Sequence, residues 1–384
     1  MQTRLKISLG FFMFLQYFVW GAWYVSMATY LSKTLHFGGE QIGLAYGAFA
    51  IGAMVSPFFV GLIADRYFPS EKILAFLALL GGALLFVLSK LTAFGSFYPV
   101  LIIYCATYVP TLALITSLSL HHLTNPKRDL PLVKALTAVG WIAGGVTVSV
   151  LFEAEQSAAQ FQIAGAMSIL LGLFALTLPH TPPKKTGKDV RIGEILGLDA
   201  LALLKKPSFA IFIACMFLIC IPLYFYFVNM NLYVTELGWK YSVAKMSLAQ
   251  VSDIIFLILL PVMLRYFGYK KTIFIGILSW AARYFLLSGS VEMLSMQTLF
   301  VYTAILLHGV CYDFLFITGQ LYVDDEANER IRGAAQGLIA FILWGVGAFV
   351  GTQLAGLSLS SHAFEAPVAG FGYDWKGIWI YPAW

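Results

Sequence analysis

Two carboxylates interrupt long apolar runs of this sequence, where an ionised side chain is costly. Asp253 follows Gln250 by three residues, and Asp313 follows Tyr312 near the middle of the run 296–322. A charge at the centre of a membrane helix costs at least about 2.5 kcal/mol, so such residues mark binding sites and ion pathways by default. A buried carboxylate can hold a ligand hydroxyl or amide, or it can take up a proton. We therefore consider Asp313 first and Asp253 second as proton-coupling residues.

Side chains on the same helix faces extend the chemistry of these carboxylates. Gln250 and Asp253 project from one face, and an amide beside a carboxylate suits a nucleobase edge or a pair of sugar hydroxyls. Phe316 shares a face with Asp313 at helical spacing. The alternative for each carboxylate is a structural ion pair, in particular a tie between Asp253 and Arg283 on the next helix. The two interpretations are compatible, and both stay open.

Further polar and aromatic residues inside apolar runs suit a flat, polar ligand that stacks and hydrogen-bonds at once. The ionisable residues of this kind are Lys134, Asp253, Arg283 and Asp313. Lys134 lies at the start of its run, so it either extends to the lipid headgroups or contacts ligand, and Trp141 lies two turns further along the same face. The other candidates are Gln16 and Trp20 in the first run and Tyr224 and Asn229 in the seventh.

The composition excludes a soluble protein and gives no sign of an enzyme. The chain is 60% hydrophobic and 11% charged, against about 25% charged residues in a soluble domain. Its four cysteines lie in apolar runs, at spacings that suit neither a disulfide framework nor a metal site. No phosphate-binding loop, paired-cysteine motif or nucleophile elbow is present. We expect no cofactor and no metal.

The apolar runs predict an all-α integral membrane protein. We expect spans near 8–31, 41–64, 73–90, 97–120, 132–152 and 160–179, then near 208–235, 243–264, 271–289, 296–322 and 333–357. These are eleven spans, and a twelfth begins at 376–384, which suggests a truncated last helix. The predicted domains are an N-terminal six-helix bundle over 1–180, a cytoplasmic linker over 181–207 and a C-terminal bundle over 208–384.

The distribution of positive charge predicts the orientation. Most of the 24 Lys and Arg lie in cytoplasmic segments if the N-terminus is cytoplasmic, as the positive-inside rule requires. The net charge of +5 is then explained by topology and by the lipid bilayer as partner. We expect no binding to nucleic acid.

A charged turn between the second and third runs carries the first resemblance. Gly61, Asp65, Arg66 and Lys72 fit the pattern G-x-x-x-D-R-x-x-x-x-[RK], with a weaker echo at 265–271. This pattern resembles the signature loop of the major facilitator superfamily, which implies two six-helix halves. The resemblance assigns structural or gating roles to Gly61, Asp65 and Arg66, and we place Arg283 with them as a structural residue.

Longer motifs narrow the resemblance to one family. They are Leu15-Gln-Tyr-Phe-Val-Trp-Gly-Ala-Trp23, Tyr108-Val-Pro-Thr-Leu112, Thr177-Leu-Pro-His180, Leu196-Gly-Leu-Asp-Ala-Leu-Ala-Leu203, Tyr312-Asp-Phe314 and Ile331-Arg-Gly-Ala-Ala-Gln-Gly337. The chain resembles the bacterial nucleoside:proton symporters. The resemblance implies a monomer in the bacterial inner membrane that imports nucleosides with protons by alternating access, through a central site between two halves. It also implies that Gln250 with Asp253, and Tyr312 with Asp313, serve the ligand and the proton.

Some positions depart from the family pattern and leave the ligand open. Lys134 stands where an arginine is usual, Asp253 where a glutamate is usual, and Tyr224 and Phe227 where a polar pair is usual. The loss of the bidentate arginine fork changes what that position can hold. A facilitator of sugars or other small polar solutes, or a membrane sensor that does not transport, are the alternative functions.

Overall fold

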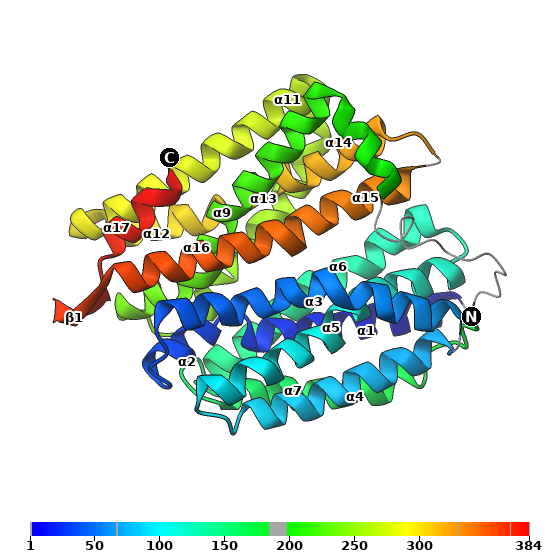
Figure 1. Ribbon diagram of the computed structural model, residues 1–384, viewed down its shortest axis with the longest axis horizontal. Helices are drawn as coiled ribbons and strands as arrows, with labels where there is room; N and C mark the ends of the chain where they lie inside the picture. The colour runs from blue at the N-terminus through cyan, green and yellow to red at the C-terminus, as the bar shows by residue number, and fades with distance from the viewer. Residues whose placement is uncertain (1, 67, 184–197, 330, 369, 384) are drawn as a thin grey trace. The chain divides into compact units, whose positions relative to one another are not determined.

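The computed structural model describes residues 2–66, 68–183, 198–329, 331–368 and 370–383, without the side chains of 56–66, 127, 198 and 199. Nearly all of this chain is helical (Figure 1). It divides into two compact units. Unit 1 comprises Met1–Phe37, Leu44–Asp189 and Tyr241–Ala244, and unit 2 comprises Gly38–Gly43, Val190–Lys240 and Lys245–Trp384.

Unit 1 is a bundle of long apolar helices. In chain order these are α1 (Gln2–Trp23), α2 (Met27–Lys33), α3 (Gly39–Arg66), α4 (Ser70–Leu88), α5 (Phe94–His122), α6 (Pro126–Val146) with the π-helical turn η1 (Thr147–Leu151), and α7 (Ala159–Ala175). Helix α6 begins where Asn125 accepts a hydrogen bond from the Arg128 N–H (3.4 Å) and Pro126 supplies a preset first turn. The first residues of α3 belong to unit 2 by their contacts.

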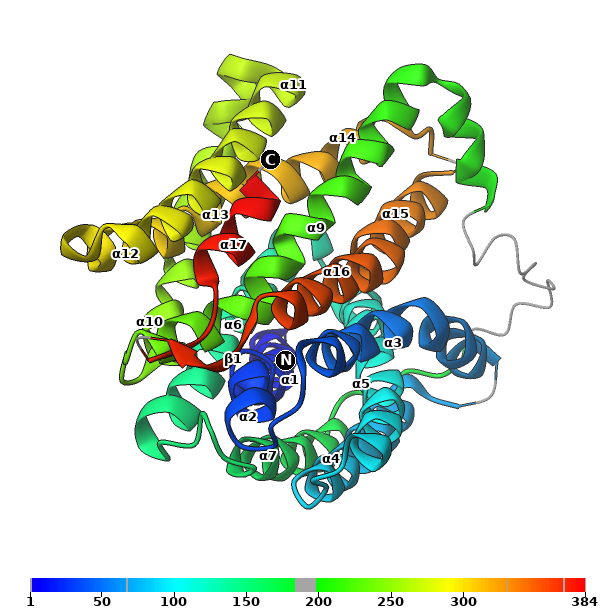
Figure 2. The ribbon, with the colours of Figure 1, turned by 60° about the vertical axis from the view of Figure 1, so that its left-hand side comes forward.

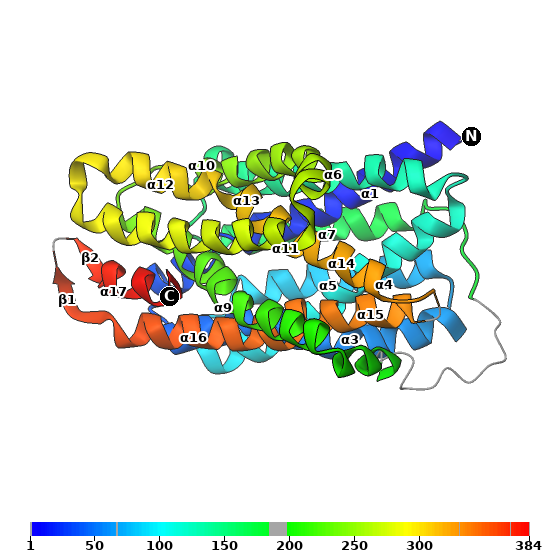
Figure 3. The same ribbon diagram turned by 90° about the horizontal axis from the view of Figure 1, so that it is seen from above.

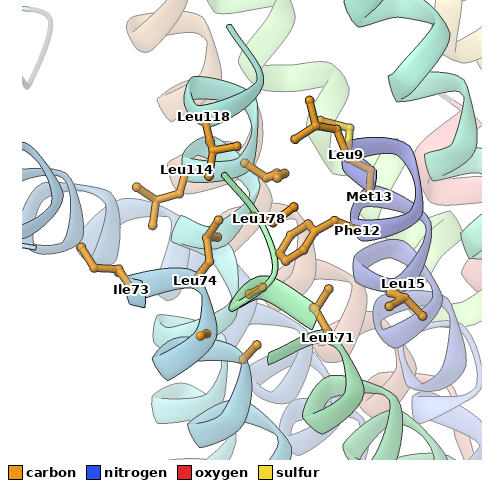
Figure 4. Packing of buried hydrophobic residues seen from close by; sticks show 14 of the residues in the cluster. Leu9, Phe12, Met13, Leu15, Ile73, Leu74, Leu114, Leu118, Leu171 and Leu178 are labelled. Atoms are coloured by element: carbon orange, nitrogen blue, oxygen red, sulfur yellow. The ribbon is translucent and has the colours of Figure 1, made fainter. Parts of the chain in front are cut away.

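The core of unit 1 is an aliphatic cluster between α1, α4, α5 and α7 (Figure 4). Leu9 and Phe12 of α1, Leu74 of α4, Leu118 of α5 and Leu171 of α7 all belong to this cluster, and each is almost fully buried. Between membrane helices such packing holds the bundle through close contact rather than through exclusion of water. The cluster therefore fixes the position of α1, which carries Gln16 and Trp20.

Unit 2 contains the more broken helices (Figures 2 and 3). In chain order the elements are η2 (Leu198–Lys205), α9 (Pro207–Glu236), α10 (Ser242–Met246, whose first residues belong to unit 1), α11 (Leu248–Glu292), η3 (Leu294–Met296), α12 (Gln297–Leu306), α13 (His308–Tyr312), η4 (Asp313–Ile317), α14 (Thr318–Glu326), α15 (Arg332–Ala340), η5 (Phe341–Val346), α16 (Gly347–Ser361), β1 (Ala363–Val368), β2 (Phe371–Tyr373), α17 (Trp375–Ile380) and η6 (Tyr381–Ala383).

Several predicted spans are interrupted. The first run breaks between α1 and α2. The predicted spans 243–264 and 271–289 correspond to the two parts of α11, which are separated by a kink at Gly268, where φ is 66° and the backbone is not helical. The run 296–322 bends by 40° between α12 and α13 and then passes through the π-helical turn η4. An antiparallel hairpin of β1 and β2, which the apolar pattern did not predict, precedes α17.

Seven helices of the described chain are long and apolar enough to cross a membrane, or eight if the bent pair that contains α12 and α13 counts as one span. Three features keep this number below the predicted eleven. The described side chains of α3 stop at residue 55, α7 has 17 residues, and the two parts of α11 count once. The membrane-protein class is confirmed, and the span count stays a prediction.

Candidate functional site

The predicted carboxylates of unit 2 lie on two neighbouring helical segments. Gln250 and Asp253 are in the first turns of α11, and Tyr312 and Asp313 lie where α13 meets η4. The side chain of Asp253 is 27% exposed, whereas Asp313 is buried. Both segments belong to unit 2.

One glycine contact sets the register between these segments. A methyl group on Gly309 would lie 2.5 Å from the carbonyl oxygen of Ser252, so only glycine permits this approach. The Ser252 hydroxyl accepts a hydrogen bond from the Gly309 N–H (3.1 Å) and donates one to the Leu306 carbonyl. Asp253 directly follows Ser252 in the chain, and His308 directly precedes Gly309. His308 Nε2 consequently lies 3.9 Å from Asp253 Oδ2.

His308 is a site residue that the sequence argument missed. Its imidazole is buried and stacks on the rings of Tyr226 and Tyr312, with centroid distances of 5.5 and 5.7 Å. His308 is a fifth ionisable residue inside an apolar run, in addition to the four named from the sequence, and it meets the same criterion. Its position four residues before Tyr312 would have placed both rings on one helix face.

Arg283 does not form the ion pair with Asp253 that was one of the two interpretations left open by the sequence. The guanidinium is fully buried, and its centre lies 4.2 Å above the ring of Tyr226 and 4.7 Å above that of Trp280. Its Nε–H donates to the Ala304 carbonyl (2.8 Å). Among the described ion pairs, none joins Arg283 to Asp253, because two aromatic faces hold the cation instead.

This cluster holds many polar atoms without a hydrogen-bond partner in the described part of the chain. They are Tyr226 OH, both amide atoms of Asn229, Asp253 Oδ1, Arg283 Nη1 and Nη2, His308 Nδ1 and Asp313 Oδ2. Buried polar atoms that stay unpaired cost about 1–3 kcal/mol each. Eight of the fourteen atoms of this kind in the described chain belong to these residues of unit 2. Such unpaired atoms are typical of a site that pairs them with a ligand, a proton or water.

Asp313 opens a π-helical turn. The turn η4 carries Asp313 to Ile317, and its wider spacing lets the Thr318 hydroxyl donate to the Asp313 carbonyl (3.2 Å). Tyr312 and Phe316 face one another with ring centroids 5.2 Å apart. Such turns in membrane and soluble helices occur frequently at functional sites. The predicted set of Tyr312, Asp313 and Phe316 is therefore brought together.

The predicted residues of the seventh run all lie on α9, in two different settings. Tyr224 and Phe227 pack with ring centroids 5.9 Å apart, and Phe227 also meets His308 edge to face at 6.3 Å. Asn229 lies one turn beyond Tyr226 and is fully buried. Phe227 thus connects the predicted residues of α9 to the cluster around His308.

Unit 1 contains a separate aromatic cluster around Trp20. The indole of Trp20 stacks on Phe49 (4.6 Å, 7°) and meets Trp141 edge to face (5.1 Å, 81°). Gln16, one turn earlier, donates to the Thr111 hydroxyl (2.7 Å), and its backbone carbonyl accepts from Tyr108 (2.8 Å). The structure therefore brings Trp20 and Trp141 together and gives Gln16 a role in tying α1 to α5.

A small-residue contact between α1 and α6 places Trp141 beside Trp20. A methyl group on Gly140 or Gly144 would overlap the carbonyl of Phe14 or Phe18, and Gly21 in turn lies against the Trp141 backbone. Two glycines four residues apart allow membrane helices to approach closely. Lys134, on the same helix, is exposed.

The predicted gating residues of the charged turn are only partly placed. Gly61, Asp65 and Arg66 lie at the C-terminal end of α3. Their side chains lie outside the described residues, so their role stays a prediction.

Arg283→Lys is expected to destabilise the folded protein by about 1–3 kcal/mol. Lysine keeps the charge but loses the planar group that covers two rings and the Nε–H that reaches Ala304. The melting temperature of the purified protein in detergent should fall clearly. Arg332→Lys is the matched control, because its contact with Asp324 is 3.4 Å long and exposed. An equal effect of the two changes would contradict the role given to Arg283.

Helical units of high hydrophobicity with buried, partly unpaired ionisable groups are typical of membrane transporters, in which such groups mark substrate and ion pathways. The sequence profile of the nucleoside H+ symporter family matches residues 1–384. The chain belongs to the nucleoside H+ symporter family. It is a multi-pass inner membrane transporter with nucleoside and proton as substrates, and it is not an enzyme.

Individual relatives agree with this family. The chain is 40% identical to a putative nucleoside transporter, YegT, of Escherichia coli (strain K12), over 100% of this chain and 91% of the relative. It is 30% identical to xanthosine permease of the same organism, over 98% and 91%. A crystal structure of a point mutant of the nucleoside transporter NupG matches with a TM-score of 0.92 and 28% identity, over 99% of this chain and 96% of that one. The predicted major facilitator fold is thereby confirmed.

Proposed function

We propose that the chain carries nucleosides and protons by alternating access, with the polar cluster of unit 2 holding both. The observation that supports this is the set of unpaired polar atoms around Asp253, His308 and Asp313 in an apolar helical unit. A carboxylate buried in this way changes charge only if a proton or a ligand compensates. Binding of one substrate then changes the affinity for the other, and this mutual effect is the thermodynamic basis of symport.

The proposed roles follow the contacts of each residue. Asp313 is the first proton-coupling residue and Asp253 the second. The amides of Gln250 and Asn229 provide hydrogen bonds for the polar edge of a nucleobase or for ribose hydroxyls. Aromatic rings supply stacking surfaces, which are worth about 1–3 kcal/mol per base. The rings and remaining polar groups proposed to line the path are Gln16, Trp20, Lys134, Trp141, Tyr224, Phe227, Tyr312 and Phe316.

The proposed organisation keeps the predicted domains. Two six-helix halves over 1–180 and 208–384 are joined by a cytoplasmic linker over 181–207, with the N-terminus in the cytoplasm and the chain acting as a monomer. Support comes from the concentration of Lys and Arg in the segments that this orientation places in the cytoplasm.

Labelled-uridine uptake into proteoliposomes tests the proposal. We expect uptake above that of empty liposomes, stimulated by an inward proton gradient and abolished by a protonophore. Other unlabelled nucleosides should compete, and hexoses should not. Uptake that ignores the gradient, or competition by hexoses alone, would instead favour a facilitator of other solutes. Binding of uridine without any flux by the folded protein would favour a sensor.

A further inference from the structure

The imidazole of His308 is held in a fixed plane at the start of α13. Tyr226 of α9 and Tyr312 of α13 stack on it at interplanar angles of 28° and 18°, and Phe227 closes a third side edge to face. The neighbouring Gly309–Ser252 contact fixes the backbone. A side chain confined in this way can orient another group, because little rotational freedom remains to be lost.

The charged and titratable groups that face His308 within unit 2 come from all three packed segments. They are Asp253 and Arg283 of α11, Tyr226 of α9 and Tyr312 of its own helical segment, and Asp313 is a further carboxylate close enough to Asp253 to interact with it electrostatically. Arg283 and His308 lie against the same ring, that of Tyr226. A second cation beside this buried guanidinium would be repelled, so the imidazole acts as a neutral hydrogen-bond donor.

The Asp253 carboxylate is the acceptor within reach of that donor. Nε2 of His308 lies 3.9 Å from Asp253 Oδ2, which a small side-chain movement shortens to a hydrogen bond. Nδ1 of His308 has no partner in the described chain and is able to carry the lone pair when Nε2 carries the hydrogen. A donated N–H stabilises the ionised carboxylate over the protonated one.

We propose that His308 is a positioning residue, which holds the Asp253 carboxylate through Nε2–H and sets the pH at which that carboxylate takes up its proton. The inference rests on the proposed function in one respect, namely that Asp253 takes part in the coupling of proton and nucleoside transport. The proton affinity of the Asp253 carboxylate is then controlled by His308, a side chain that does not itself carry the transported proton.

Infrared spectroscopy of the full chain tests this without any transport. Subtraction of the spectrum of Asp253→Asn isolates the band of the protonated Asp253 carboxyl, whose midpoint is followed over pH. His308→Gln keeps an N–H donor and should leave the midpoint within a few tenths of a pH unit. His308→Phe keeps a ring for the stack but removes the donor, and should move the midpoint to higher pH by about one unit or more.

A histidine outside the cluster around His308 provides the control. His121→Phe, on α5 of unit 1, should leave the midpoint unchanged. His308→Leu repeats the loss of the donor if the phenylalanine variant fails to fold. The inference is overturned if either apolar variant keeps the unaltered midpoint, if His308→Gln shifts as far as they do, or if no Asp253 band titrates at all.

The pH profile of uridine uptake separates this inference from the proposed function. If both hold, His308→Phe shifts the pH of half-maximal uptake in the same direction as the infrared midpoint. Absence of gradient-driven uptake in the unaltered protein, together with a shifted infrared midpoint, would reject symport of uridine and keep the role of His308. Normal uptake together with an unshifted infrared midpoint would keep symport of uridine and reject the role of His308.

Discussion

Asp313→Asn should abolish gradient-driven accumulation of uridine in proteoliposomes and reduce it to the level of empty liposomes. Asp313 is buried at the start of η4, and its Oδ2 has no hydrogen-bond partner among the described residues. Asparagine has the same shape as the protonated acid but cannot exchange a proton. The energetic link between gradient and solute is then lost.

Binding should survive this substitution, because the amide offers a donor and an acceptor like those of the protonated carboxyl. We expect the dissociation constant for uridine, measured by calorimetry, to change by less than about tenfold, or 1.4 kcal/mol. Asp324→Asn, in α14 beyond the π-helical turn, is the matched control and should accumulate uridine normally. Continued accumulation by Asp313→Asn would remove this residue from the proton path.

Gly144→Leu should have the largest effect on folding. The Gly144 position lies against the Phe18 carbonyl and the Ala22 N–H of α1, which are backbone atoms and cannot rotate away. Overpacking costs about 1–3 kcal/mol where side chains can adjust, so more is expected here. The melting temperature should fall by at least about 5 °C, and the Trp20–Trp141 contact should open.

Gly337→Leu is the matched control for this prediction. Gly337 is also helical, in α15, and a methyl group there would meet no described atom within 4 Å. Both variants add the same side chain to a helical glycine, so their difference measures the helix contact alone. Equal melting temperatures would show that α1 and α6 can separate without cost.

Long apolar runs predicted the positions of the helices because each run must lie in a helix to satisfy its backbone in a membrane. The breaks could not be predicted in the same way. The break between the predicted spans 243–264 and 271–289 is present as a kink at Gly268, which has a positive φ, but the break between α12 and α13 lies inside a single apolar run and has no such mark. The η4 turn has no mark in composition, because its origin is an extra residue in the hydrogen-bond ladder.

The sequence predicted the site residues that are neighbours in the chain, and it missed the contacts between residues that only the packing of helices brings together. Asp313 and Tyr312 are chain neighbours, so their association follows from the sequence. Asp253 and His308 are far apart in the chain, and their approach depends on the Gly309–Ser252 contact. An ion pair of Arg283 with Asp253 was one of two open interpretations, but the rings of Trp280 and Tyr226 cover the guanidinium instead; Trp280 follows from helical spacing, whereas Tyr226 comes from another helix.

The π-helical turn at Asp313 also bears on how this chain can vary. A turn of this kind holds one residue more than an α-helical turn. Removal of a single residue between Asp313 and Ile317 would take out that extra residue and restore a regular helix, and Gln320, whose carbonyl accepts from Gln336 of α15, would keep its direction. A deletion from a regular α-helical stretch would instead rotate everything after it by about 100°. The turn is therefore the place in this segment where the chain can lose one residue and keep the phase between the two ends of the helix.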